Sequence, residues 1–317
     1  HKYNTTDYFE IDCHFGDKKT FRKLVDEAHQ RGMKIMLDAV FNHIGDQSPQ
    51  WQDVLKNGEN SVYKDWFHVQ EFPVTKDKLD NPRNLPYHTF AFESYMPKLN
   101  TANPQVRDYL LSVATYWIEE FDIDAWRLDV ANEVDHQFWR DFRKAVLAKK
   151  PDLYILGEVW HTSQPWLNGD EFHAVMNYPL SDSIKDYFLR QHKKTEQFIS
   201  EINSQSMYYK QQISEVMFNL LDSHDTERIL TTAKGNVQHV KAALTFLYLQ
   251  KGTPCIYYGT ELALIGGPDP DCRRVMPWDR VSEDNDMLNF MKKLIQVRKG
   301  VASIIQHGSY SLQEVKP

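Results

Sequence analysis

Short apolar runs alternate with stretches of helical periodicity along most of this chain. The runs predict strands at 34–41, 123–130, 153–159, 174–178, 215–221 and 253–259. They are nearly continuous rather than alternating, which is typical of parallel strands buried on both faces. Strands that alternate with helices predict an α/β fold, in which a parallel sheet lies inside a layer of helices.

The predicted helices carry recognisable boundary signals. Asp17 is a suitable N-cap for a helix that Gly32 ends. Asn103 followed by Pro104 opens a second helix, and Asp135 begins a third. Further helices are predicted from about 181, over 236–250 and near 285–298.

Residues 44–103 interrupt this alternation. The stretch is polar and aromatic, is rich in proline and shows no sustained period. An excursion of this length between two strands is usually a small subdomain or a functional loop. We therefore predict that it is inserted between two strand–helix units.

The composition narrows the range of functions. The 317 residues are 41% hydrophobic and 26% charged, with a net charge of −7, as in ordinary soluble domains. Basic residues are scattered and no apolar run approaches the roughly 20 residues of a membrane span, so we expect neither nucleic acid nor a membrane as partner. The three cysteines show neither a disulfide framework nor zinc spacing, which favours a reducing, cytoplasmic compartment. The chain starts at His1 without Met, so we expect it to be part of a longer protein, and a signal peptide would lie outside this sequence.

Polar residues gather where the predicted strands end. Arg127 and Asp129 lie at the end of the second apolar run, and Glu158 lies at the end of the third. His224 and Asp225 follow the fifth. The first run ends in a similar set: Asp38, Asn42 and His43. The C-terminal ends of the strands form the catalytic face of a (β/α)8 barrel, so these side chains are expected to converge, with residues 127 and 129 on the same side of their strand.

Paired carboxylates on neighbouring strands suit the cleavage of a glycosidic bond. One carboxylate attacks the anomeric carbon and one carboxylic acid protonates the leaving oxygen. Asp129 is the expected nucleophile, because the nearby Arg127 should keep it ionised. Glu158 follows an apolar run, a setting that keeps a proton available for general-acid catalysis. Asp225, beside His224, could hold sugar hydroxyls and stabilise an oxocarbenium-like charge.

Each of these residues also has a plainer explanation. An Arg–Asp pair taken alone is more often a structural ion pair, and a lone glutamate after a strand is about as often solvated. His43 or His224 alone would more often be a hydrogen-bonding scaffold, and most tryptophans and tyrosines would belong to the core. The recurrence of such residues at several strand ends favours the catalytic interpretation.

Several segments resemble the signature sequences of the α-amylase superfamily. Four match in order: DAVFNH at 38–43, WRLDVANE at 126–133, GEVWH at 157–161 and LLDSHDTER at 220–228. MPKLN at 96–100 resembles the extra segment near the end of that family's inserted domain B. The first residues, HKYNTTDYFEIDCHFG, resemble the stretch after its second barrel strand. VANE together with MPKLN is similar to the neopullulanase, cyclomaltodextrinase and maltogenic amylase group.

The resemblance implies a TIM barrel catalytic domain, (β/α)8, that is incomplete here, with about strands 3 to 8. It divides the chain into a barrel start at 1–43, an inserted domain B at 44–103, the barrel remainder at 104–300 and the start of a C-terminal β domain at 301–317. Because dimers of this group use an N-terminal domain that lies outside this sequence, the longer enzyme is expected to be a homodimer.

The resemblance also implies roles for single residues. Asp129 would be the nucleophile, Glu158 the acid/base and Asp225 the transition-state stabiliser. The substrate-binding residues would be Tyr3, His43, Arg127, Glu133, Trp160 and His224. Tyr3 would stack on the sugar next to the cleaved bond, while Glu133 and Trp160 would line the acceptor side.

The implied activity is the retaining hydrolysis of α-1,4 bonds in α-glucan oligosaccharides, with transglycosylation. Substrates would be cyclodextrins, pullulan and maltooligosaccharides. An oligo-1,6-glucosidase-like exo-enzyme is the first alternative, and a non-catalytic α-amylase-like subunit is the second. Many amylases bind calcium near the domain B junction, often through the position of Asn42, but no dense Asp/Asn loop stands out in 44–103. We therefore expect no cofactor and no required metal.

Overall fold

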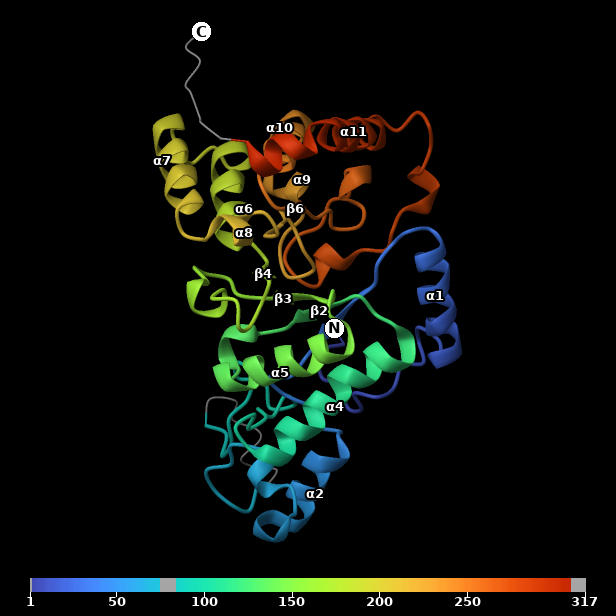
Figure 1. Ribbon diagram of the computed structural model, residues 1–317, viewed down its shortest axis with the longest axis vertical. Coiled ribbons are helices and arrows are strands. Elements are labelled where there is room, and N and C mark those ends of the chain that lie inside the picture. The colour runs from blue at the N-terminus through green and yellow to red at the C-terminus, as the bar shows by residue number, and fades with distance from the viewer. Residues whose placement is uncertain (1, 75–83, 309–317) are drawn as a thin grey trace. The chain divides into compact units, whose positions relative to one another are not determined.

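The computed structural model describes residues 2–74 and 84–308. Figure 1 shows the chain as a ribbon. It divides into two compact units. The first unit comprises His1–Glu158 and Asn168–Phe172, and the second comprises Val159–Leu167 and His173–Pro317.

Three parallel strands build the sheet of the first unit. They are β1 (Met36–Ala39), β2 (Ala125–Leu128) and β3 (Tyr154–Gly157). β2 lies in the middle, with Arg127 opposite Asp38 of β1 and opposite Leu156 of β3. Because the strands are parallel, their C-terminal ends meet at one edge, where Asp129 follows β2 and Glu158 follows β3.

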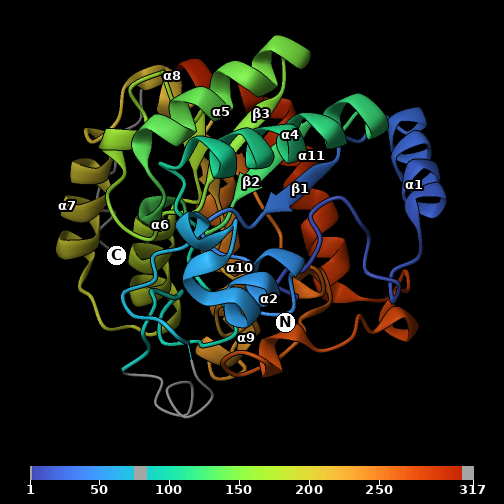
Figure 2. The same cartoon turned by 90° about the horizontal axis from the view of Figure 1, so that it is seen from below.

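Helices α4 and α5 lie side by side next to this sheet (Figure 2). The α-helices of the described part of the first unit are α1 (Lys18–Gln30), α2 (Pro49–Asn57), α4 (Pro104–Phe121) and α5 (His136–Lys149). The predicted caps are confirmed, because Asp17, Asn103 and Asp135 each accept a hydrogen bond from a backbone N–H of the first turn. Gly32, with φ +71°, follows the end of α1 as predicted.

Aromatic side chains join α5 to Phe41, which lies two residues after the end of β1. The Phe41 ring lies 6.2 Å from the Phe138 ring and 6.1 Å from the Phe142 ring, edge to face. All three side chains are fully buried. Burial of each such ring stabilises the fold by roughly 1.5–3 kcal/mol, so this contact anchors the sheet edge that carries the polar residues.

The segment 44–103, as far as the structure describes it, lies within the first unit, between β1 and α4. Its strand-like pairings are antiparallel: His43 with Lys98, Phe67 with Leu99, Val69 with Tyr87, and Thr89 with Pro97. Trp51 of α2 is buried and packs against the rings of Phe67 and Tyr87. A helix packed on antiparallel pairs interrupts the parallel fold here.

The second unit contains the remaining short strands. They are β4 (Ala174–Val175), β5 (Phe218–Asn219) and β6 (Thr253–Pro254). β5 and β6 are parallel neighbours, and Met176 pairs with Phe218 in the same sense. The α-helices of its described part are α6 (Tyr178–Ile184), α7 (Thr195–Ser206), α8 (Gln211–Ser214), α9 (Ile229–Thr232), α10 (Val237–Tyr248) and α11 (Asp286–His307), and a π-helical turn (Lys185–Leu189) follows α6.

Apolar faces of these helices form the core of the second unit. Ile184, Ala243 and Leu247 are fully buried, and Met291 of α11 joins them. Over the residues that the structure describes, no helix combines the length and the apolar character needed to cross a membrane.

Strands occur at all six predicted places, but each is shorter than its apolar run. The helix expected from about 181 begins at Tyr178. The last helix extends to His307, so the expected start of a C-terminal β domain at 301 falls inside α11, and 309–317 lie outside the described residues.

Candidate active site

Arg127 is the centre of a cluster of charges in the first unit. Its Nη1 atom donates to Asp129 Oδ1 at 2.7 Å and to both oxygens of Asp38 at 2.9 and 3.0 Å. Its Nη2 atom lies 2.8 Å from Glu158 Oε1. The guanidinium, Asp129 and Glu158 are all buried. One planar fork thus aligns the two carboxylates that the sequence analysis proposed as a catalytic pair.

The backbone after β2 directs this cluster. Asp129 N–H donates to Ala39 O at 3.0 Å, which extends the parallel pairing by one residue. Val130 then adopts a left-handed conformation, with φ 46° and ψ 41°. A β-branched residue is strained there, and such strain persists only where the surrounding structure holds it. In this turn, Val130 N–H donates a hydrogen bond to Glu158 Oε2 at 3.0 Å. The residue next to Asp129 therefore holds the Glu158 carboxylate in place.

Tyr3 and His43 lie at the same edge. The Tyr3 hydroxyl donates to Asp38 Oδ2 at 2.8 Å, and His43 Nε2 lies 2.9 Å from Tyr3 O. Burial lowers the pKa of His43 to about 4, so its ring is neutral at neutral pH. Burial, reinforced by Asp38, also holds the pKa of Tyr3 well above its usual value. Both side chains are thus neutral hydrogen-bonding groups beside the carboxylates.

The ionisation expected for Asp129 is not what the structure indicates. Burial raises the pKa of Asp129 to about 8; Arg127 opposes this, but Asp38 and Glu158 reinforce it. Arg127 also contacts Asp38 and Glu158, so its charge only partly offsets the cost of burying the Asp129 carboxylate. The Asp129 carboxyl group therefore retains its proton to a higher pH than an ordinary aspartate does.

Glu133 lies in the turn that follows Asp129. It ends a short 3-10 helix, Ala131–Glu133, and its side chain is partly exposed. Lys98 Nζ contacts Glu133 Oε2 at 3.1 Å and Glu133 O at 3.0 Å. The same ammonium donates to Asn42 Oδ1 at 2.8 Å. No role was predicted for Lys98, although its place within MPKLN was an available signal.

Asp225 and His224 form a separate group in the second unit. His224 Nε2 lies 3.1 Å from Asp225 Oδ2, and Arg273 Nη2 lies 3.5 Å from Asp225 Oδ1. Arg273 Nε also donates to His224 O at 3.0 Å. Arg273 was not predicted, because no pattern in the sequence connects it with Asp225. The preceding Asp222 is buried, which raises its pKa to about 6, and it accepts a hydrogen bond from Thr260 Oγ1 at 2.8 Å.

Trp160 lies in the second unit as a stacked, half-exposed ring. It is 47% exposed, and its ring lies 3.9 Å from the ring of Tyr178, with 6° between the planes. A rigid exposed aromatic face is a suitable platform for a sugar ring. Tyr178, which the sequence analysis missed, holds this platform in place.

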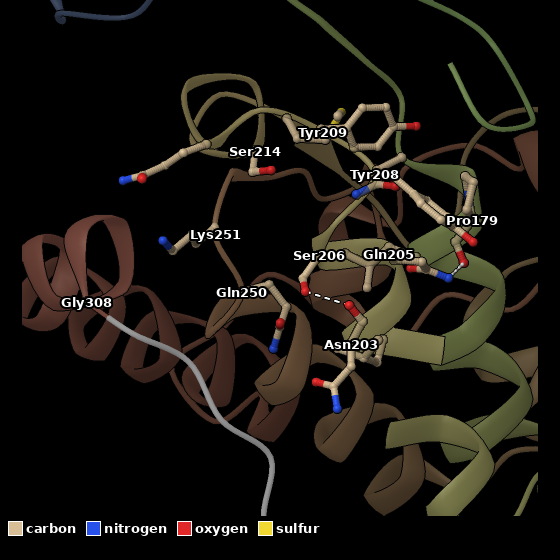
Figure 3. Close-up of a pocket in the computed structure, with 15 residues that line it drawn as sticks. Pro179, Asn203, Gln205, Ser206, Tyr208, Tyr209, Ser214, Gln250, Lys251 and Gly308 are labelled. Atoms are coloured by element: carbon tan, nitrogen blue, oxygen red, sulfur yellow. Dashed lines mark hydrogen bonds between the residues drawn. The ribbon is translucent and has the colours of Figure 1, made fainter. Parts of the chain in front are cut away.

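A cavity of about 400 Å³ lies elsewhere in the second unit (Figure 3). Amide, hydroxyl and tyrosine side chains dominate its lining. Gln205 Nε2 donates to Pro179 O at 3.2 Å, and Ser206 Oγ donates to Asn203 O at 2.7 Å. None of the predicted site residues lines this cavity, so cavity size alone does not identify the candidate site.

Two places in the first unit hold groups of potential metal ligands. At Asn42, where the resemblance implies calcium, the amide oxygen accepts a hydrogen bond from the Lys98 ammonium. A divalent cation there would meet a positive charge, so these residues do not fit calcium. Within residues 2–74 and 84–308, one group of three exposed side chains has its ligand atoms within 4.8 Å of one another: Asp12, Cys13 and His14. Lys2 Nζ already pairs with Asp12 at 2.5 Å.

The fold and this site define the class of protein: the chain belongs to the α-amylase family. The family model described as "Alpha amylase, catalytic domain" matches residues 1–300. The match covers the first unit and most of the second, and it includes every candidate site residue.

Within this family, the chain is most informatively compared with three relatives. The chain is 56% identical over 308 residues to the intracellular maltogenic amylase of Bacillus subtilis (strain 168), covering 97% of this chain and 51% of that protein. It is 50% identical to neopullulanase 2 of Thermoactinomyces vulgaris, with 96% and 51% covered. The solved structure of a cyclomaltodextrinase superposes with a TM-score of 0.92 at 53% identity, covering 97% of this chain and 52% of that one. The chain thus has the α/β fold of that structure and part of its catalytic barrel, and it spans about half the length of the curated relatives it matches.

Proposed function

We propose that this chain is the catalytic part of a retaining α-glucan hydrolase that also transfers glycosyl groups. The observation that carries the proposal is the Arg127 guanidinium, which binds Asp129 at 2.7 Å and Glu158 at 2.8 Å. The proposed substrates are cyclodextrins, pullulan and maltooligosaccharides joined by α-1,4 bonds. The names of relatives at 50–56% identity support this class of substrate.

The proposed mechanism has two steps. In the first, Glu158 gives its proton to the glycosidic oxygen while an Asp129 oxygen attacks the anomeric carbon, so the glycosidic bond breaks and a covalent glycosyl ester forms. In the second, the Glu158 carboxylate takes a proton from water or from a sugar hydroxyl, whose oxygen displaces Asp129. Water completes hydrolysis, and a sugar completes transglycosylation.

The raised pKa of Asp129 bears on this chemistry. The mechanism needs one protonated and one ionised carboxyl group at the same time, and the raised pKa of Asp129 indicates that the cluster retains a proton near neutral pH. The attack needs Asp129 in its ionised form, so the proton leaves Asp129 before Glu158 protonates the leaving oxygen. Arg127 would then stabilise the Asp129 carboxylate that attacks.

Other residues would bind the sugar. Tyr3 would stack on the ring beside the cleaved bond, and His43 would help to hold that ring. Asp225, with His224, would stabilise the developing positive charge. Glu133 and Trp160 would line the acceptor side.

The finer architecture is proposed on the same basis. We assign β1 to β6 as strands 3 to 8 of an eight-stranded barrel and residues 44–103 as domain B. The whole enzyme would act in the cytoplasm, because one relative is named as intracellular, and it would form a homodimer. Gel filtration with light scattering of the whole enzyme tests the dimer.

The test is reducing-sugar release from β-cyclodextrin by the whole enzyme, with Asp129→Asn measured in parallel. Cleavage by the wild type that is absent in the variant would support the proposal. Without cleavage of the ring, glucose released from pullulan would favour an exo-acting 1,6-glucosidase, whereas panose would favour the neopullulanase activity. Absence of any turnover in a folded sample would favour the non-catalytic alternative.

A further inference from the structure

The Lys98 ammonium lies among three oxygen atoms of different kinds. They are the amide oxygen of Asn42 at 2.8 Å, the backbone oxygen of Glu133 at 3.0 Å and the Glu133 carboxylate at 3.1 Å. An ammonium has three protons to donate, so one donor is available for each oxygen. Amide, carbonyl and carboxylate oxygens are also the ligands that a hard divalent cation prefers. The surroundings are those of a cation site, and a lysine of the chain supplies the cation.

The backbone holds Lys98 in this position. Lys98 pairs with His43 in an antiparallel bridge, Leu99 N–H donates to Asn42 O at 3.0 Å, and Ile44 N–H donates to Pro97 O at 3.2 Å. The lysine therefore starts beside Asn42, and its side chain reaches the turn after β2. It ties the segment 44–103 to the turn that carries Glu133, four residues after Asp129.

We propose that Lys98 is a built-in cation that replaces a divalent metal ion at this place and positions Glu133. The second part rests on the proposed function, in which Glu133 lines the acceptor side. With the ammonium present, the fold needs no calcium here. Without it, the three oxygens lack a partner and Glu133 loses its orientation.

The first test measures the thermal unfolding midpoint of the whole enzyme in EDTA and in millimolar CaCl2. Wild-type protein should give the same midpoint in both. Lys98→Ala, which leaves room among the oxygens, should unfold about 2–4 °C lower in EDTA and recover in CaCl2. Lys98→Met fills the space without charge, so it should fall equally and not recover. Lys64→Met, at an exposed lysine of the same segment, is the matched control and should change neither value.

Two results would overturn the proposal that Lys98 replaces a metal ion. One is a lower wild-type unfolding midpoint in EDTA than in CaCl2, and the other is a Lys98→Ala midpoint that is the same in both. Because this readout needs no substrate, it stands even where the proposed activity fails.

The second test measures the ratio of transfer to hydrolysis products from maltotriose. Lys98→Met should change this ratio about 3- to 10-fold, as expected for the loss of a charge-assisted hydrogen bond, while Lys98→Arg should recover most of it. In a Glu133→Gln background the Lys98→Met change should disappear, because the lysine acts through the glutamate. An unchanged ratio, or an equal change in both backgrounds, would overturn the positioning of Glu133 by Lys98. Wild-type turnover in the same assay separates these results from a failure of the proposed function.

Discussion

Replacing Asp129 by asparagine is expected to abolish turnover and to stabilise the fold. The amide cannot attack the anomeric carbon, so activity is lost. The stability gain follows from the buried position of the carboxyl group, whose pKa is raised to about 8. In the unfolded chain the same group ionises at about pH 3.9, so at about pH 7 unfolding is favoured by the release of its proton.

The size of this effect can be worked out from the shift. A pH of about 7 lies some three units above the pKa of the aspartate in the unfolded chain. Because each unit corresponds to about 1.4 kcal/mol, ionisation on unfolding favours the unfolded state by about 4 kcal/mol at most. The asparagine has no proton to release, but its amide N–H2 must fit beside Asp38 and Glu158. We therefore expect a net gain of about 1–3 kcal/mol in the free energy of unfolding at neutral pH.

The gain should depend on pH with a defined sign. A carboxyl whose pKa is raised in the folded state penalises folding only above its unfolded pKa. The difference between Asp129→Asn and wild type should therefore be small at about pH 4 and grow as the pH rises towards 8. Urea unfolding at several pH values measures it, with Asp65→Asn as an exposed control in the same unit. A variant that is less stable than wild type by the same amount at every pH would refute this reasoning.

Three further variants test other contacts. Glu158→Gln should slow maltotriose hydrolysis far more than hydrolysis of an α-glucosyl fluoride, whose leaving group needs no proton; equal losses would contradict the acid role. Gly157→Ala should lower the free energy of unfolding by about 1–3 kcal/mol, because the added Cβ would lie 2.5 Å from the Phe172 ring. Adding Phe172→Leu should recover part of this loss. An unchanged free energy in urea unfolding of Gly157→Ala would contradict the packing argument. Arg228→Met should lower the free energy of unfolding by about 2–4 kcal/mol, since the fully buried guanidinium donates to Cys272 O and Tyr258 O. Arg228→Lys should recover less than half of this loss, because lysine lacks the planar guanidinium with its several donors. Unchanged stability in either Arg228 variant would contradict that account.

Much of the fold could be predicted because its signals are local. Continuous apolar runs mark strands buried on both faces, and Asp17, Asn103 and Asp135 cap the helices that they precede. The strands are shorter than their runs because residues such as Phe41 and Val130 leave the sheet to form the site edge. Strand length therefore depends on where the chain turns, which an apolar run does not reveal.

The site was predictable where alternation along one strand decided it, as for Arg127 and Asp129. The raised pKa of Asp129 was not predictable, because it depends on burial and on Asp38 and Glu158, which come from other strands. The contact of Lys98 with Asn42 joins residues 56 positions apart through an antiparallel pairing inside an irregular segment. The periodicity of apolar residues in the sequence does not predict such a contact.

The central claim is that Asp129 and Glu158 cleave a glycosidic bond with retention of configuration. Proton NMR of the first product formed from maltotriose by the whole enzyme tests it most directly, before mutarotation mixes the anomers. The account predicts that the α-anomer appears first, because two displacements at one carbon restore its configuration. Initial appearance of the β-anomer would contradict the covalent role of Asp129 and the pairing of the two carboxylates through Arg127.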